Sequence, residues 1–114
     1  MASVEELSKY YWGALDSNNL TEFIAIKPNE EEIANDLNAP PQPVKSQGAL
    51  VINGYYFKGD GSLVYHEMSC GYMVSKGTWK LNDNTIEMVI EGVDIVKKIT
   101  YFEAGNKLIL SNVK

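Results

Sequence analysis

Residues 76–88 read KGTWKLNDNTIEM. An Asn-Asp-Asn turn signal at 82–84 separates two runs in which apolar and polar residues alternate. Trp79 and Leu81 share one face of the first run, and Ile86 and Met88 share one face of the second. Alternation on both sides of a tight turn is typical of an antiparallel hairpin with one buried face. We therefore predict strands at 74–81 and 85–91.

The pattern continues on both sides of this hairpin. Turn signals at 58–61, 70–71, 92–94 and 104–106 divide the second half of the chain into runs rich in β-branched and aromatic residues. We predict further strands at 49–57, 62–69, 95–102 and 107–113. Asn53-Gly54, a strong hairpin signal, allows the first of these to fold on itself. Neighbouring strands joined by short turns pair with each other, so we expect a meander of about six strands that forms a small barrel or curved sheet.

The first half of the chain carries helix signals. Ser3 and Glu6 form a capping box, and Val4, Leu7 and Tyr11 follow at helical spacing, which predicts a helix over 4–15. Residues 20–26 fit either a helix or a short strand. A second, short helix is predicted to begin at 28–32 and to end before the proline-rich bridge at 40–43. The fold class is α+β, with a helical part (1–45) that plugs or covers the meander (46–114) in a single domain.

The amino-acid composition of the chain limits the kinds of partner that it is expected to bind. The 114 residues carry fifteen acids against ten basic residues, all of them lysine, for a net charge of −5. Arginine, the preferred residue for phosphate and guanine, is absent, so we do not expect a nucleic acid partner. No apolar run approaches the roughly 20 residues that a membrane span needs. The acidic, amphipathic start and the single cysteine favour a cytoplasmic protein, and the alternative is an exported fragment without its signal peptide.

The stretch at 56–62 (YFKGDGS), the stretch at 76–88 and the run at 106–111 (NKLILS) together resemble small bacterial lipocalin-like domains, over residues 54–113. The resemblance implies a small antiparallel barrel that binds an apolar ligand or a protein partner. Residues 4–23 also resemble, more loosely, the opening helices of NTF2-like proteins. That resemblance implies a curved sheet around a pocket, but the acid–base pair of the catalytic members has no counterpart here.

Few residues offer catalytic chemistry. His66 is the single histidine, and its neighbour Glu67 points to the opposite face of the same predicted strand, so the two do not form an acid–base pair. Cys70 lies four residues from His66, and two ligands fall short of a structural zinc site. We predict no catalytic residue, no metal and no cofactor, and we expect a binding protein rather than an enzyme.

Aromatic residues are the best candidates for a binding surface, because they combine apolar area with a polar tip. The first hypothesis is a protein partner with a basic surface, or a second copy of the chain, bound by Tyr10, Tyr11, Glu30, Glu31 and Glu32. The second is a small apolar ligand inside the sheet. For it we name Tyr56, Tyr65, His66, Trp79, Met88 and Tyr101, with Ile90 and Leu108 in the same wall. An enzyme that uses His66 is the third and weakest hypothesis.

Overall fold

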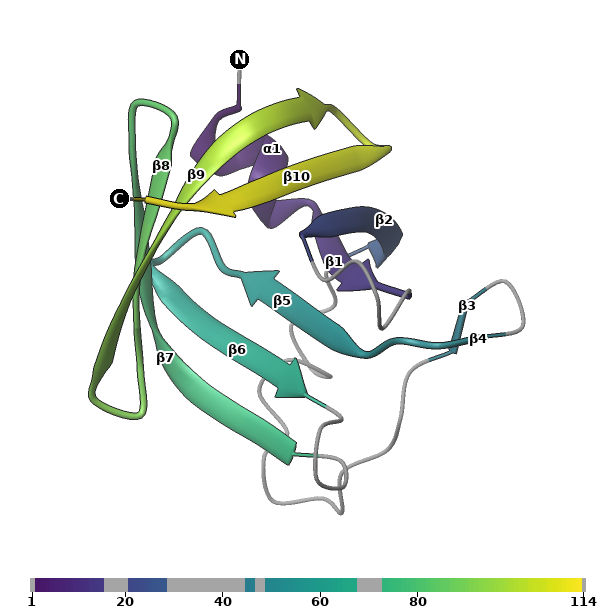
Figure 1. Ribbon diagram of the computed structural model, residues 1–114, viewed down its shortest axis with the longest axis horizontal. Coiled ribbons are helices and arrows are strands. Elements are labelled where there is room, and N and C mark those ends of the chain that lie inside the picture. The colour runs from purple at the N-terminus through teal and green to yellow at the C-terminus, as the bar shows by residue number, and fades with distance from the viewer. Residues whose placement is uncertain (1, 16–20, 29–44, 47–48, 68–72, 114) are drawn as a thin grey trace.

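The computed structural model describes residues 2–15, 21–28, 45–46, 49–67 and 73–113 (Figure 1). Eight strands form a closed barrel in the order β1-β2-β10-β9-β8-β7-β6-β5. The helix α1 (Val4–Ser8) precedes the barrel, and β3 (Lys45–Ser46) pairs with β4 (Ala49–Leu50) outside it. The barrel strands are β1 (Tyr10–Ala14), β2 (Glu22–Pro28), β5 (Asn53–Phe57), β6 (Ser62–Glu67), β7 (Met73–Asn82), β8 (Thr85–Ile90), β9 (Val93–Glu103) and β10 (Lys107–Asn112).

The predicted meander is confirmed from β5 to β10, where each strand pairs antiparallel with the next. The predicted number of strands is wrong, because the barrel has eight and not six. The two additional strands form the β1–β2 hairpin, which closes the barrel by pairing β1 with β5 and β2 with β10. Residues 20–26, which fitted either a helix or a strand, lie largely in β2.

The predicted helix over 4–15 is wrong beyond Ser8. Its capping signal is confirmed, because the Ser3 hydroxyl accepts a hydrogen bond from the Glu6 amide at 3.2 Å. From Tyr10 onward the chain is a strand, since a run of bulky aromatic residues followed by Gly13 suits a pleated sheet better than a helix. Pairing on both sides, with β2 and with β5, then decides the conformation.

The core fills the barrel interior, where each strand contributes every second residue. Its fully buried members include Trp12, Phe57, Leu63, Ile86 and Leu108. Helix α1 closes one end, because Leu7 is fully buried in the same cluster and its carbonyl accepts a hydrogen bond from the Trp12 indole at 2.9 Å. Figure 1 shows α1 leading directly into β1 at this closed end.

A second buried cluster lies on the outer face of β1, β5 and β6. Tyr11 stacks on Tyr56 with ring centroids 4.2 Å apart, and His66 packs against both rings. Gly54 makes room for this stack, since a Cβ there would overlap the Tyr11 hydroxyl. The predicted hairpin at Asn53-Gly54 is therefore wrong. Both residues lie within β5, where Gly54 pairs with Gly13 on one side and His66 on the other.

Four of the predicted turns are confirmed by backbone geometry. Gly61, Gly92, Gly105 and Asp83 all have positive φ angles, which glycine and aspartate tolerate. Asp60 accepts hydrogen bonds from the amide and hydroxyl of Ser62, which hold the pKa of its carboxyl below the usual range. The second predicted helix, the proline-rich bridge and the turn at 70–71 lie outside the described residues. No helix in the described ranges is long and apolar enough to cross a membrane.

Candidate functional site

The end of the barrel opposite α1 is hollow. A cavity of about 350 Å³ opens there, between the first residues of β2, β5 and β9 and the last residues of β6 and β10. These strand ends meet because neighbouring strands in the barrel alternate in direction. The described residues of its wall are Thr21, Phe23, Asn53, Tyr55, Tyr65, Ile95, Lys97, Leu110, Ser111 and Asn112.

Three aromatic rings form one side of the cavity. The Tyr55 ring lies 5.2 Å from Phe23 and 5.0 Å from Tyr65, measured between centroids. Below it, Tyr55 stacks on Phe57, which in turn contacts Trp79 near the closed end. The cavity is thus continuous with the core, and its aromatic wall is held by packing against that core.

Tyr55 and Tyr65, which both line the cavity, each carry a hydroxyl group. Burial raises the pKa of Tyr55, and burial together with the charge of Glu67 raises the pKa of Tyr65 to about 12. Both phenols are therefore protonated at neutral pH and can donate a hydrogen bond. Neither hydroxyl has a hydrogen-bond partner within the part of the chain that the structure describes.

Lys97 brings a positive charge to the cavity wall. It faces inward between Ile95 and Ile99 on β9, and its Nζ donates to the Asn112 Oδ1 at 2.6 Å. The cavity wall, as far as the structure describes it, contains no carboxylate. The ion pairs of the described residues, at Lys9, Lys80 and Lys107, do not include Lys97.

The structure places five of the six predicted ligand-binding residues in three different surroundings. Tyr65 lines the cavity, whereas Trp79 and Met88 lie in the core with Ile90 and Leu108. Tyr56 and His66 lie in the outer buried cluster, because strand alternation turns Tyr55 and Tyr65 inward in their place.

The structure does not place Tyr101 in the cavity wall, although Tyr101 was predicted to bind a ligand there. It lies on the outer face of β9, 46% exposed, and its hydroxyl donates to Glu103 at 2.9 Å. A register shift in the β9–β10 pairing adds Thr100 as an extra residue, so Phe102 takes the inward position that alternation from Ile99 assigns to Tyr101.

The residues predicted to bind a protein partner are not gathered on a described surface. Tyr11 is fully buried, and Tyr10 packs edge-on against Trp12 at 5.9 Å. A buried side chain offers no surface to a partner, so Tyr11 is not available for that role in this conformation. Glu30, Glu31 and Glu32 lie outside the described residues.

The sequence analysis missed Lys97, Phe23 and Tyr55. Lys97 left a signal, because Ile95, Lys97 and Ile99 follow each other at a spacing of two within a predicted strand. Phe23 left none, since its segment fitted a helix as well as a strand. Tyr55 is the direct neighbour of Tyr56, and no local pattern chooses between the two rings.

Catalytic chemistry finds little support in the described residues. His66 contacts the Tyr11 hydroxyl at 3.4 Å on the outer face, away from the cavity. No group of three or more histidine, cysteine, aspartate or glutamate side chains is placed to hold a metal within the described ranges.

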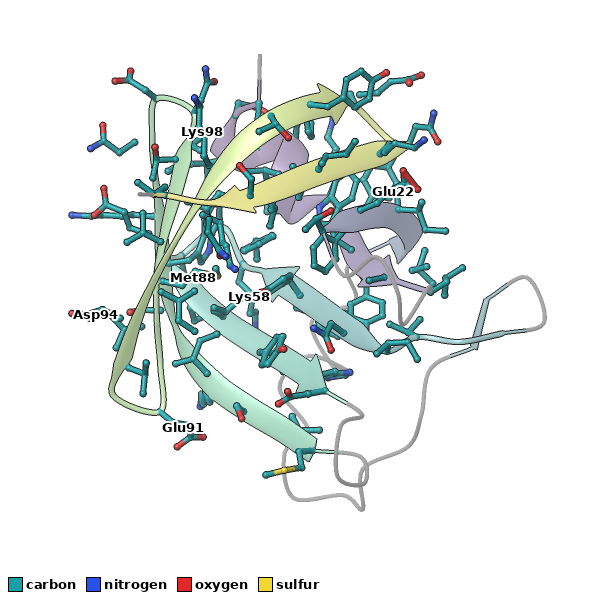
Figure 2. All side chains as sticks on the ribbon, in the orientation of Figure 1. Glu22, Lys58, Met88, Glu91, Asp94 and Lys98 are labelled. Atoms are coloured by element: carbon teal, nitrogen blue, oxygen red, sulfur yellow. The ribbon has the colours of Figure 1, made fainter. Side chains whose placement is uncertain are left out.

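A shallower groove of about 460 Å³ follows the outer face of β7, β8 and β9. Its outward-facing residues include Val89, Val96 and Asp94, together with Lys80 and Glu87, whose charged groups lie 3.6 Å apart. Figure 2 shows Met88 on the inner side of this wall and Asp94 on the outer side. The wall therefore separates two different surfaces, one inside the barrel and one outside.

Comparison of the chain with family models, with curated proteins and with solved structures gave no match.

Proposed function

We propose that this protein binds a small, mainly apolar molecule in the open end of its barrel and catalyses no reaction on it. The observation that supports this function best is a hollow of about 350 Å³ behind an aromatic wall, in a barrel that α1 closes at the other end. Ligand sites have volumes of roughly 300 to 1,000 Å³ and mostly apolar walls with a few polar groups, and the mouth of a β-barrel is a common place for them.

The size of the cavity limits the ligand. A non-hydrogen atom takes up about 30 Å³ in a liquid such as water, so about a dozen of them fill the cavity. At about 0.5 kcal/mol per atom, within the usual range of ligand efficiency, such a molecule binds with about 6 kcal/mol. That free energy corresponds to a dissociation constant on the order of tens of micromolar.

The proposal is tested by filling the cavity. Ile95 lines the cavity and its neighbour Val96 lies on the outer face, so Ile95→Trp and Val96→Trp form a matched pair. The probe is 1-aminonaphthalene, a neutral aromatic molecule that is small enough for the cavity and whose fluorescence shifts to shorter wavelength in apolar surroundings. We expect the wild type and Val96→Trp to bind it alike, and Ile95→Trp to bind it at least tenfold more weakly. Circular dichroism checks that both variants are folded.

Two outcomes would contradict this function. One is an Ile95→Trp variant that is folded and binds the probe as tightly as the wild type. The other is a wild-type protein that shows no saturable binding up to millimolar probe. Native mass spectrometry of the freshly purified protein is an independent check, because a bound molecule that co-purifies adds its mass to the 12.7 kDa chain.

A protein partner is the second candidate function. Its support is the outer groove on β7–β9, where Val89 and Val96 are 39% and 41% exposed beside charged side chains. If this face joins two copies of the chain, the wild type sediments as a dimer and a Val89→Glu/Val96→Glu variant as a monomer. A wild type that stays monomeric at 100 μM excludes the homodimer. The role of Glu30, Glu31 and Glu32 toward a basic partner stays a prediction.

A further inference from the structure

Lys97 occupies a position in the barrel where an apolar residue is expected. It faces inward between Ile95 and Ile99, and its cross-strand partner on β8 is Ile86, a fully buried residue of the core. Lys97 is half-buried: it lines the cavity, and its ammonium group finds a hydrogen-bond partner at the solvent-exposed mouth. The partner in the structure is the neutral side-chain oxygen of Asn112, at 2.6 Å.

Within the described ranges, no ion pair compensates the charge of Lys97. A lysine ammonium has three donors, and among the described residues Asn112 is its one hydrogen-bond partner. No carboxylate belongs to the described wall of the cavity, although the chain as a whole carries a net charge of −5. A single positive charge at the mouth of a low-dielectric cavity attracts anions and repels cations.

We infer that the ligand is an amphipathic anion, with a carboxylate or similar group on an apolar body, and that Lys97 binds its charged end. This inference rests on the proposed function. The anion lies beside Lys97 and Asn112 on the β9–β10 side of the mouth. The apolar body extends toward Phe23, Tyr55 and Leu110.

The position of Glu67 on the opposite side of the mouth indicates that the ligand carries one negative charge rather than two. Glu67 shares the inward face of β6 with Tyr65, and its charge acts on both tyrosine hydroxyls. A second anionic group near the tyrosines would be repelled by Glu67. A cation held by Glu67 and the aromatic rings is the rival reading, but Lys97 lines the cavity and Glu67 is not part of its wall.

The test compares three probes with the same eight-carbon chain: octanoate, octanol and octylammonium. They are titrated by isothermal calorimetry at pH 7.4 and low salt into the wild type, Lys97→Met and Lys98→Met. Lys98 is the matched control, because it is the next residue and is exposed on the outer face. A charge-assisted hydrogen bond predicts that the wild type binds octanoate about ten- to a hundredfold more tightly than octanol, with octylammonium weakest. Lys97→Met removes the preference and Lys98→Met keeps it.

The outcomes separate this inference from the proposed function. If octanoate and octanol bind equally well to the wild type, and Ile95→Trp weakens both, the anion inference is wrong and the cavity still binds ligands. The inference is equally wrong if octylammonium binds most tightly, or if Lys98→Met loses as much affinity for octanoate as Lys97→Met. If none of the three probes binds at millimolar concentration, the proposed function fails, and the inference fails with it.

Discussion

Tyr55 and Tyr56 are neighbours in β5 with different surroundings. Tyr55 contributes its ring to the cavity wall, and its hydroxyl lies in a buried site that disfavours ionisation. Tyr56 stacks on Tyr11 in the outer cluster, with His66 against its edge. Strand alternation alone separates them. The chemistry of the cavity therefore depends on the register of β5, and a shift by one residue would exchange the two rings.

The first prediction concerns alkaline pH. The folded-state pKa is raised above the ordinary value near 10 for both Tyr55 and Tyr65, to about 12 in Tyr65. The neutral phenol is favoured in the folded protein, so this contribution to stability is fully present below pH 10 and is lost as the pH rises through 12. Urea unfolding from pH 8 to 12 should show a free energy of unfolding that falls above pH 10.

The control is the double variant Tyr55→Phe/Tyr65→Phe. It keeps the ion pairs at Lys9, Lys80 and Lys107, and it removes the two phenols. We expect its free energy of unfolding to fall less steeply above pH 10. Parallel curves for the variant and the wild type would show that the two phenols are not the cause.

The second prediction concerns Gly54. A Cβ at this position would overlap the Tyr11 ring, which lies fully buried across the glycine. Gly54→Ala forces that ring to move, and overpacking of this kind costs about 2 kcal/mol. Gly59→Ala is the matched control, since the nearest atom to its Cβ is the Ser8 hydroxyl at 4.0 Å, and its effect should stay within about 0.5 kcal/mol. Equal free energies of unfolding for the two variants in urea would contradict the tight contact.

Among the elements, α1 has the clearest mechanical role. A helix of five residues is not stable by itself in water, so packing must hold it in place. Leu7 provides that packing at the closed end of the barrel, and the Trp12 indole binds the Leu7 carbonyl. The packing of Leu7 and the hydrogen bond from the Trp12 indole therefore hold the helix over this end of the barrel.

The third prediction tests this plug. Leu7→Ala removes a fully buried side chain and should lower the free energy of unfolding by about 3 kcal/mol. Val4→Ala changes an exposed side chain of the same helix and should have an effect of less than about 0.5 kcal/mol. Both values come from urea unfolding at neutral pH. A Leu7→Ala variant as stable as Val4→Ala would mean that α1 does not close the barrel.

The elements also show what local sequence can predict. Strands β6 to β10 can be predicted from local sequence. Their turns contain residues that tolerate positive φ, such as Gly92 and Gly105, and apolar and polar residues alternate between the turns. The β1–β2 hairpin cannot be predicted in this way. Residues 10–14 continue the helical pattern that begins at the Ser3 cap, and pairing with β2 and β5 overrides that pattern. The inward faces of Trp79 and Met88 were predictable for the same local reason.

The cavity could not be predicted from such patterns. It depends on which strands meet when the barrel closes, and closure pairs Phe23 of β2 with Leu108 of β10, far along the chain. The register shift that turns Tyr101 outward is likewise a property of the β9–β10 pairing, with no turn signal of its own. Long-range pairing thus decides the site, whereas local signals decide most of the strands.

In the whole molecule, barrel closure links the fold to the proposed function. The β1–β2 hairpin is inserted so that β2 and β5 flank β1, and β2 joins β10 through three residue pairs and the Lys107–Glu22 ion pair at 3.5 Å. This arrangement brings Phe23 into the same wall as Tyr55 and Leu110. The barrel is therefore closed at one end by α1 and the core, and it holds a cavity at the other end.

The measurement that tests binding inside the barrel most directly is methyl-resolved NMR of the protein during titration with 1-aminonaphthalene, whose rings shift nearby methyl signals. Binding in the cavity predicts that the methyl signals of Ile95 and Leu110 shift, while those of Val89 and Val96 on the outer groove do not. Shifts at Val89 and Val96, with Ile95 and Leu110 unchanged, would place the ligand outside the barrel and contradict the account.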